Sequence, residues 1–118
     1  MYGVPKDLDL SGFVGKTLIQ VCVGEYQIQF HFHPTSGISA ERHWELLDGK
    51  GGVLDRDIRN AERNAYRVHR LLGQHVQSWE VDPPASFSLT FGNGLILRVH
   101  DDSQQFESCS IWPGDIFI

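Results

Sequence analysis

The sequence has little sulfur, with two cysteines and one methionine among 118 residues. Two cysteines are too few for a disulfide-stapled scaffold. Cys22 lies in an apolar run, and Cys109 lies two residues after the acidic Glu107, so neither has a basic sequence neighbour that would favour a reactive thiolate. We expect two reduced thiols, at least one of them buried, as cytosolic chemistry favours.

Long apolar runs are also missing. No stretch approaches the ~20 residues of a membrane span, and the first ten residues show no basic region followed by an apolar core. The sequence therefore predicts a cytoplasmic protein with no signal peptide and no membrane contact. The net charge of −5 argues against nucleic acid as a partner, because the phosphates would be repelled.

The motifs of common enzymes are absent. The sequence has no G-x-S-x-G nucleophile elbow, no G-x-x-x-x-G-K-[ST] phosphate loop and no H-x-x-x-H pair. We predict no catalytic residue, no metal and no cofactor. His31 and His33 alternate with phenylalanines, so we expect the aromatic rings to face the core and the histidines to face solvent. With His43 and His100, they should not converge on an ion.

A repeated pattern is what the sequence does have. Residues 15–54 and 73–118 each begin at a glycine and continue through an apolar run that ends in valine. A second run in each copy, residues 26–30 and 87–91, alternates large apolar with polar residues, which is typical of a strand with one buried face. We predict an internal duplication, in which two related antiparallel β-meanders pack as a sandwich or a partly open barrel.

The turns of the two copies are expected to differ. Asn93-Gly94 lies between two alternating runs, and this pair favours a tight hairpin because both residues tolerate positive φ. The first copy has residues 31–37 at this place, which predicts a longer and less regular connection. Pro34 has no N–H to donate, so its strand should end there or lie at an edge.

The alternating runs also predict the core. Six apolar side chains share the face expected to be buried: Phe30, Phe87, Leu89, Phe91, Leu97 and Val99.

One α-helix over residues 56–72 is predicted to join the copies. Five apolar residues there fall at helical spacing, with Asp55 or Asp57 available to cap its start and Gly73 to end it. The expected fold class is thus α+β but mostly β, with residues 1–118 forming a single domain.

The predicted helix carries unusual charge. Residues 56–72 hold five arginines and two acidic residues, a net charge of +3, which leaves −8 for the rest of the chain. Arg59, Arg63, Arg67 and Arg70 form one stripe at helical spacing. The stripe is either a solvated face that pairs with the protein's own acids or a contact surface for an acidic protein partner or a second subunit.

Two glutamates occupy matching positions after an aromatic residue, Glu45 in the first copy and Glu107 in the second. If the copies pack about a twofold axis, these carboxylates could line a ligand pocket between them, since paired carboxylates can do acid–base work. The alternative is that each caps a loop or pairs with an arginine.

The final residues, 115–118, include three apolar side chains. An uncovered strand edge of this kind favours aggregation, so a cover is expected. The first copy could supply it by closing a barrel, or a second subunit could supply it in a symmetric dimer. We favour the dimer.

Part of the sequence also resembles a known group of proteins. The residues that carry it are Gly73 to Val81, Phe87 to Phe91, Gly94 to Leu97 and the run Phe106-Glu107-Ser108-Cys109-Ser110-Ile111. In this pattern the chain resembles a group of small, β-rich bacterial proteins of unknown function that are similar to proteins of toxin–immunity sets. The resemblance covers residues 71–111 well and the first copy loosely, and it implies no catalytic residue.

Two functions follow as hypotheses. The first is a non-enzymatic binding or interaction protein of the immunity kind, which fits the acidic charge and the missing catalytic motifs. The alternative is a small-ligand binding protein or weak enzyme with a pocket between the repeats. A converging polar pocket would favour the alternative, and a flat exposed patch would favour the first.

Overall fold

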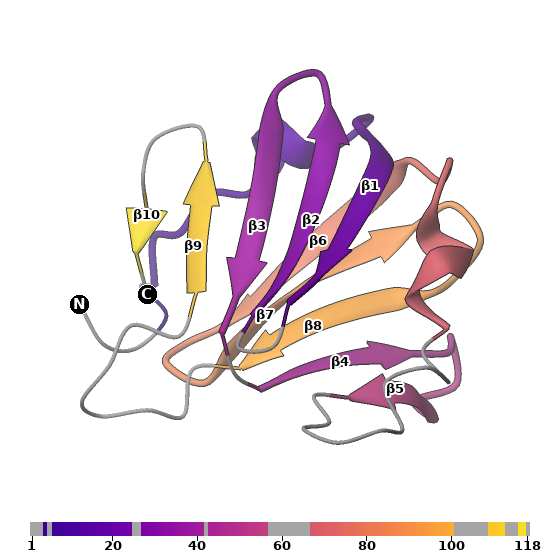
Figure 1. The fold of residues 1–118 in the computed structure, drawn as a ribbon. Coiled ribbons are helices and arrows are strands. Elements are labelled where there is room, and N and C mark those ends of the chain that lie inside the picture. The colour runs from indigo at the N-terminus through magenta and orange to yellow at the C-terminus, as the bar shows by residue number, and fades with distance from the viewer. Residues whose placement is uncertain are drawn as a thin grey trace.

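The fold is a sandwich of two antiparallel five-stranded sheets (Figure 1). The computed structural model describes residues 4, 6–24, 27–41, 43–56, 67–100, 109–112 and 116–117. The first sheet has the order β1-β2-β3-β9-β10 and the second the order β5-β4-β8-β7-β6. Within these residues the two sheets pack together and form no closed barrel, although backbone hydrogen bonds and one bridge, Thr17 with His75, join the β1 and β6 edges.

The strands are mostly short. The first sheet consists of β1 (Thr17–Val23), β2 (Ile28–His33), β3 (Ser36–Ala40), β9 (Cys109–Trp112) and β10 (Ile116–Phe117). The second consists of β4 (Trp44–Leu47), β5 (Val53–Arg56), β6 (Val76–Asp82), β7 (Ser86–Phe91) and β8 (Ile96–His100). Two short 3₁₀ turns, η1 (Ser11–Phe13) and η3 (Val68–Leu71), precede β1 and β6.

Each sheet is completed by strands from the other half of the chain. Strands β1 to β3 pair with β9 and β10 from the C-terminal end, drawn yellow in Figure 1 beside the indigo and purple strands. Strands β6 to β8 pair with β4 and β5 from the first half. Neither half therefore contains a whole sheet.

The two halves also pair in corresponding ways. Leu18 faces Phe32 just before a bulge in β1, and Val76 faces Phe91 just before a bulge in β6. The N–H of Gly15 donates to Val76 O at 2.8 Å, and the N–H of Gly73 donates to Leu18 O at 2.8 Å. Both glycines have positive φ, +87° and +80°, a backbone conformation that favours glycine. The contact between the halves is therefore reciprocal.

The core lies between the sheets, and all six side chains predicted to be buried are buried. Phe32 and Phe91, at corresponding places in the two sheets, stack with ring centroids 6.2 Å apart. Phe13 from η1 packs edge-on against Phe32. Cys22 and Cys109 are free and Cys109 is buried, in agreement with the sequence.

The predicted contrast between the turns is reversed. Strand β2 ends at His33, directly before Pro34 as expected, but only Pro34 and Thr35 separate it from β3. The second hairpin has a four-residue connection, in which the N–H of Gly94 donates to Phe91 O at 2.9 Å and Gly94 has φ +87°. The turn at Asn93-Gly94 is confirmed, and the longer connection in the first copy is wrong.

The joining α-helix over 56–72 is not confirmed. Arg56 belongs to β5, η3 is a 3₁₀ turn of four residues, and Leu72 is extended. Asp55, predicted as a helix cap, is buried in β5, where its carboxylate accepts the N–H of Arg67. Residues 57–66 lie outside the described residues. The part of the chain that is described contains no helix long and apolar enough to cross a membrane.

The C-terminal run does not close a barrel. Ile116 in β10 pairs with Ile111 in β9, and β9 pairs with β3 from the first half. Strand β10 therefore lies at the end of an open sheet, and this half of the sequence prediction is wrong. The dimer stays a prediction.

The turn between β4 and β5 is held by one carboxylate. Asp48 Oδ1 accepts the N–H groups of Gly52 and Lys50, each at 2.8 Å. The N–H of Gly52, followed by that of Lys50, holds the pKa of Asp48 below its ordinary value, because both bonds favour the charged form.

This turn predicts a pH-dependent contribution to stability. Because the folded pKa of Asp48 is below the unfolded value of about 3.9, its contribution is full above that pH and is lost as pH falls through the folded pKa. The free energy of unfolding of Asp48→Asn should therefore be lower than that of wild type at neutral pH. The difference should shrink below about pH 3.9. Urea titrations across pH test this, and a difference independent of pH would contradict it.

Candidate functional site

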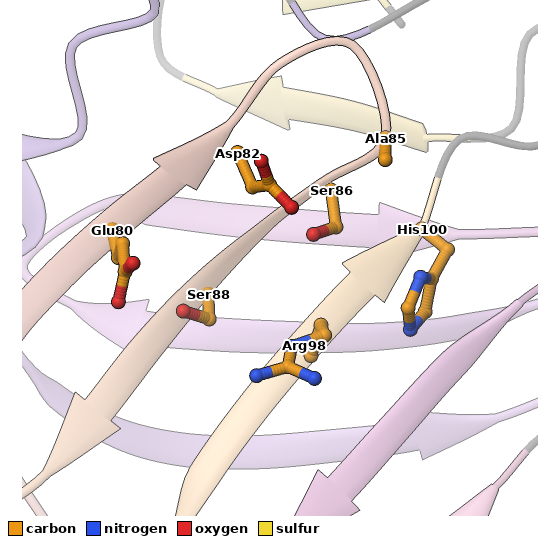
Figure 2. A pocket seen from close by; sticks show the side chains of 7 residues that line it. All are labelled: Glu80, Asp82, Ala85, Ser86, Ser88, Arg98 and His100. Atoms are coloured by element: carbon orange, nitrogen blue, oxygen red, sulfur yellow. The ribbon is translucent and has the colours of Figure 1, made fainter.

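The outer face of the second sheet carries a group of polar side chains. The apolar core residues of β7 and β8 alternate with Ser86 and Ser88 on β7 and with Arg98 and His100 on β8. Because successive side chains in a strand point to opposite faces, these four lie on the face away from the core. Figure 2 shows them on this face together with Glu80 and Asp82 from β6.

One row of this face crosses all five strands. The pairing of neighbouring strands aligns, from β6 to β5, Glu80, Ser88, Arg98, Glu45 and Arg56. Acidic and basic groups alternate along the row, with a small hydroxyl between the first two charges. Such a row presents both charge signs to a partner within one face.

A pocket of about 250 Å³ opens on this face. It is lined by Glu80, Asp82, Ala85, Ser86, Ser88, Arg98 and His100 (Figure 2). Ser86 and Ser88 are only 7% and 9% exposed. Neither hydroxyl has a hydrogen bond to another described residue. Among the described residues, every fully buried polar side-chain atom has a hydrogen-bond partner, so these two oxygens cannot be fully buried. Both hydroxyls therefore reach the pocket.

Arg98 is the cation of this pocket. Its side chain is half-buried, and it makes no hydrogen bond or ion pair with any residue that the structure describes. Figure 2 shows its guanidinium on the open side of β8, beside Ser88. All five N–H donors of the guanidinium are therefore available to a ligand.

A histidine–carboxylate pair lies beside the pocket. His100 Nε2 and Glu45 Oε1 are 2.5 Å apart, and their side chains are 23% and 18% exposed. The ring of His43 stacks on that of His100, with centroids 4.3 Å apart and an interplanar angle of 26°. The N–H of His100 donates to His43 O at 2.8 Å, which continues the pairing of β8 with β4.

The expectation that four histidines stay apart is therefore wrong for one pair. His31 lies on the other sheet, 3.1 Å from Gln29 Oε1 and edge-on to Trp112, and His33 is exposed. His43 and His100 meet because β4 pairs with β8 across the two halves. No local sequence pattern indicates the pairing of β4 with β8. The sequence brings together only His43 and Glu45, which lie two residues apart.

Of the two glutamates predicted to line a pocket together, the structure describes only Glu45. Glu45 belongs to the site, and Glu107 lies outside the described residues. In the second half, β9 pairs with β3 in the way that β4 pairs with β8. By this pairing Trp44 and Glu45 correspond to Cys109 and Ser110. The pocket lies on an outer face rather than between the halves. Sequence reasoning did not single out its serines or Arg98.

The arginine stripe is described only at its end. Arg59 and Arg63 lie outside the described residues. Arg67 directs Nη1 to Leu54 O at 3.4 Å, and the carbonyl of Arg70 accepts a hydrogen bond from the Asn93 side chain at 3.2 Å. The Arg67 side chain therefore takes part in the hydrogen bonding of the fold as well as lying at the surface.

Comparisons with protein-family models, with curated proteins and with solved structures found no match for this chain.

Proposed function

We propose that the protein is a non-enzymatic interaction protein and that the outer face of its second sheet receives an acidic side chain of a partner protein. The observation that carries the proposal is the half-buried Arg98 guanidinium, which has no partner among the described residues and lies in a pocket with two open serine hydroxyls. The cytoplasmic location and the bacterial, immunity-like character predicted from the sequence belong to the same proposal.

The chemistry of Arg98 supports a carboxylate ligand. A partly desolvated cation without a partner is unfavourable, so a group that pairs with it gains more than it would in water. The planar guanidinium can hold both oxygens of a carboxylate, and the hydroxyls of Ser86 and Ser88 can donate to an oxygen that reaches them. An aspartate or glutamate side chain matches this set.

The acidic side chains of the pocket restrict the kind of molecule that can carry the carboxylate. Glu80 and Asp82 accept hydrogen bonds and repel a second negative charge, so a plain polyanion fits poorly. An acidic residue within a polypeptide brings backbone N–H groups close to its carboxylate, and these can donate to Glu80 or Asp82. The pocket therefore suits a protein partner better than a nucleic acid, which the net charge of −5 also disfavours.

The partner contacts predicted from the sequence extend this proposal. The described end of the arginine stripe, Arg67 and Arg70, adds positive charge for an acidic partner. The dimer is a separate proposal that rests on the apolar C-terminal run.

We also propose that the two halves arose by internal duplication. The corresponding bulges in β1 and β6, the reciprocal bonds of Gly15 and Gly73, and the equal numbers of strands exchanged between the sheets support it. Each half is then a β-meander that lends two strands to the sheet of the other.

Binding of a short acidic peptide tests the proposed function. The probe is Gly-Asp-Gly with blocked ends, and Gly-Asn-Gly is the matched uncharged probe. Isothermal titration should show saturable binding of the first and at least about tenfold weaker binding of the second, because a charge-assisted hydrogen bond contributes about 1.5–3 kcal/mol. Arg98→Ala should cause a similar loss.

Arg56→Ala is the control variant, because it removes the same charge from the same row outside the pocket. It should leave the affinity for Gly-Asp-Gly within about fivefold of wild type, since an exposed ion pair contributes only ~1 kcal/mol or less. Equal losses in Arg98→Ala and Arg56→Ala, or no preference for aspartate over asparagine, would contradict the proposal.

One observation favours a second candidate function, a small-ligand protein with weak acid–base activity. The His100–Glu45 hydrogen bond places a proton-transferring pair at the edge of the pocket. The described residues offer no nucleophile bonded to His100, which is why this function ranks second. Turnover of a small ester that Glu45→Gln abolishes would favour it over simple binding.

A further inference from the structure

We infer that His43, Glu45 and His100 form a binding site for a divalent transition-metal ion. The inference does not rest on the proposed function: the site shares His100 with the lining of the pocket, but it does not use Arg98 or the two serines. The sequence predicted no metal site, since the pattern shows no ligand spacing of a known kind. The fold creates one by bringing two histidines from different halves together.

The backbone places the three side chains on one face. Trp44 and Leu46 point into the core, so Glu45 in β4 and His43, which directly precedes this strand, point outward. His100 ends β8 and is fixed opposite His43 by a backbone hydrogen bond of 2.8 Å. The ligands therefore come from two adjacent strands whose spacing is set by the sheet.

The distances are close to those of a coordination shell. The candidate ligand atoms of the three residues all lie within 4.8 Å of one another. Metal–nitrogen bonds of about 2.0–2.1 Å in a tetrahedral site separate neighbouring ligand atoms by roughly 3.3 Å. The separations in the structure therefore exceed this value by at most about 1.5 Å, and His43 lies at the exposed side of the group, where a small side-chain adjustment meets the least packing.

The donor set indicates the class of ion. Two imidazole nitrogens and one carboxylate oxygen suit zinc, copper, nickel or cobalt, whereas calcium and magnesium prefer oxygen alone. On binding, the ion takes the place of the hydrogen bond between Glu45 and His100. For Nε2 of His100 to present a lone pair to the ion, the ring must carry its proton on Nδ1. Solvent reaches the site and can fill the remaining positions.

Titration of the metal-free protein with zinc chloride in a calorimeter tests the site. We expect one zinc ion per chain, with binding at least about tenfold weaker in His43→Ala and in His100→Ala, because each variant removes a ligand. His31→Ala is the matched control, since it removes a partly exposed histidine from the other sheet. Its zinc affinity should equal that of wild type.

Cobalt gives a second readout that loss of the fold would not imitate. The wild-type complex should show visible absorption bands of bound cobalt, and these should change in position or intensity in Glu45→Gln. Circular dichroism verifies that each variant is folded. Arg98→Ala should bind zinc normally, which separates this site from the proposed peptide pocket.

Zinc affinity unchanged in both His43→Ala and His100→Ala would overturn the inference. So would wild-type protein that binds no zinc in the calorimeter, or a wild-type cobalt spectrum identical to that of Glu45→Gln. A larger loss in His31→Ala than in His43→Ala would also count against it, because the ion would then bind to the first sheet.

Discussion

Replacing Phe91 with alanine is expected to lower the free energy of unfolding by about 3–5 kcal/mol. Phe91 is fully buried and stacks on Phe32 from the opposite sheet, with ring centroids 6.2 Å apart. The substitution removes the whole ring from a position fixed by the β6–β7 and β7–β8 pairings, so the surroundings cannot collapse into the cavity. Urea denaturation followed by tryptophan fluorescence measures the loss.

Val23→Ala is the control for this experiment. Val23 belongs to β1 and is 51% exposed, so its truncation should change stability by less than about 0.5 kcal/mol. A loss under about 1 kcal/mol for Phe91→Ala would show that this face of β7 does not lie in the core.

Separating the two halves is expected to abolish folding of each half alone. A cut within residues 57–66 leaves β1 to β5 on one fragment and β6 to β10 on the other. Each fragment then keeps three strands of one sheet and two strands that belong to the other sheet. Neither can bury its apolar face, and a lone two-stranded hairpin is at best marginally stable in water. Mixing the fragments should restore the circular dichroism of the intact chain.

The complementation has its own control. Leu46 in β4 is fully buried against the partner strand β8, so a first fragment carrying Leu46→Ala should bind the second fragment more weakly. Replacement of the exposed Val23 in the same fragment should have little effect. A fragment that unfolds cooperatively on its own would contradict the exchanged arrangement of the strands.

The sequence predicts the local features of this fold well. Alternation from Phe87 to Phe91 and from Leu95 to Val99 fixes which face is buried, because a one-residue error would place every large side chain in water. Asn93-Gly94 and Pro34 mark where strands end, since each has a backbone preference that acts locally. These predictions depend only on neighbouring residues.

Partners from distant parts of the chain are not predictable in this way. Strand β4 pairs with β8 rather than with β3, which directly precedes it, and no periodicity in the sequence indicates that choice. The candidate metal site is not predictable for the same reason, because it combines His43 and Glu45 from one half with His100 from the other. By sequence alone Glu45 matches Glu107, because each directly follows an aromatic residue.

The helix prediction can be compared with the structure only at its two ends, because residues 57–66 lie outside the described residues. Apolar residues at helical intervals and Gly73 at the end indicated a helix to residue 72, and Gly73 does follow a helical turn. Among the described residues of this segment the turn covers Val68–Leu71, where Leu71 is buried in the core and Leu72 is extended toward β6. At the other end, Asp55 pairs within β5 and holds the N–H of Arg67 instead of capping a helix.

The central claim is that the outer face of the second sheet is the recognition surface. Mapping the binding site of the acidic peptide by nuclear magnetic resonance tests this claim most directly. The ¹⁵N-labelled protein is titrated with blocked Gly-Asp-Gly, and amide chemical shifts are followed for every assigned residue. We predict the largest changes at Ser86, Ser88 and Arg98. Gln29 and Ser39, on the outer face of the first sheet, should stay unchanged. Changes centred on the first sheet, or none at saturating peptide, would contradict the claim.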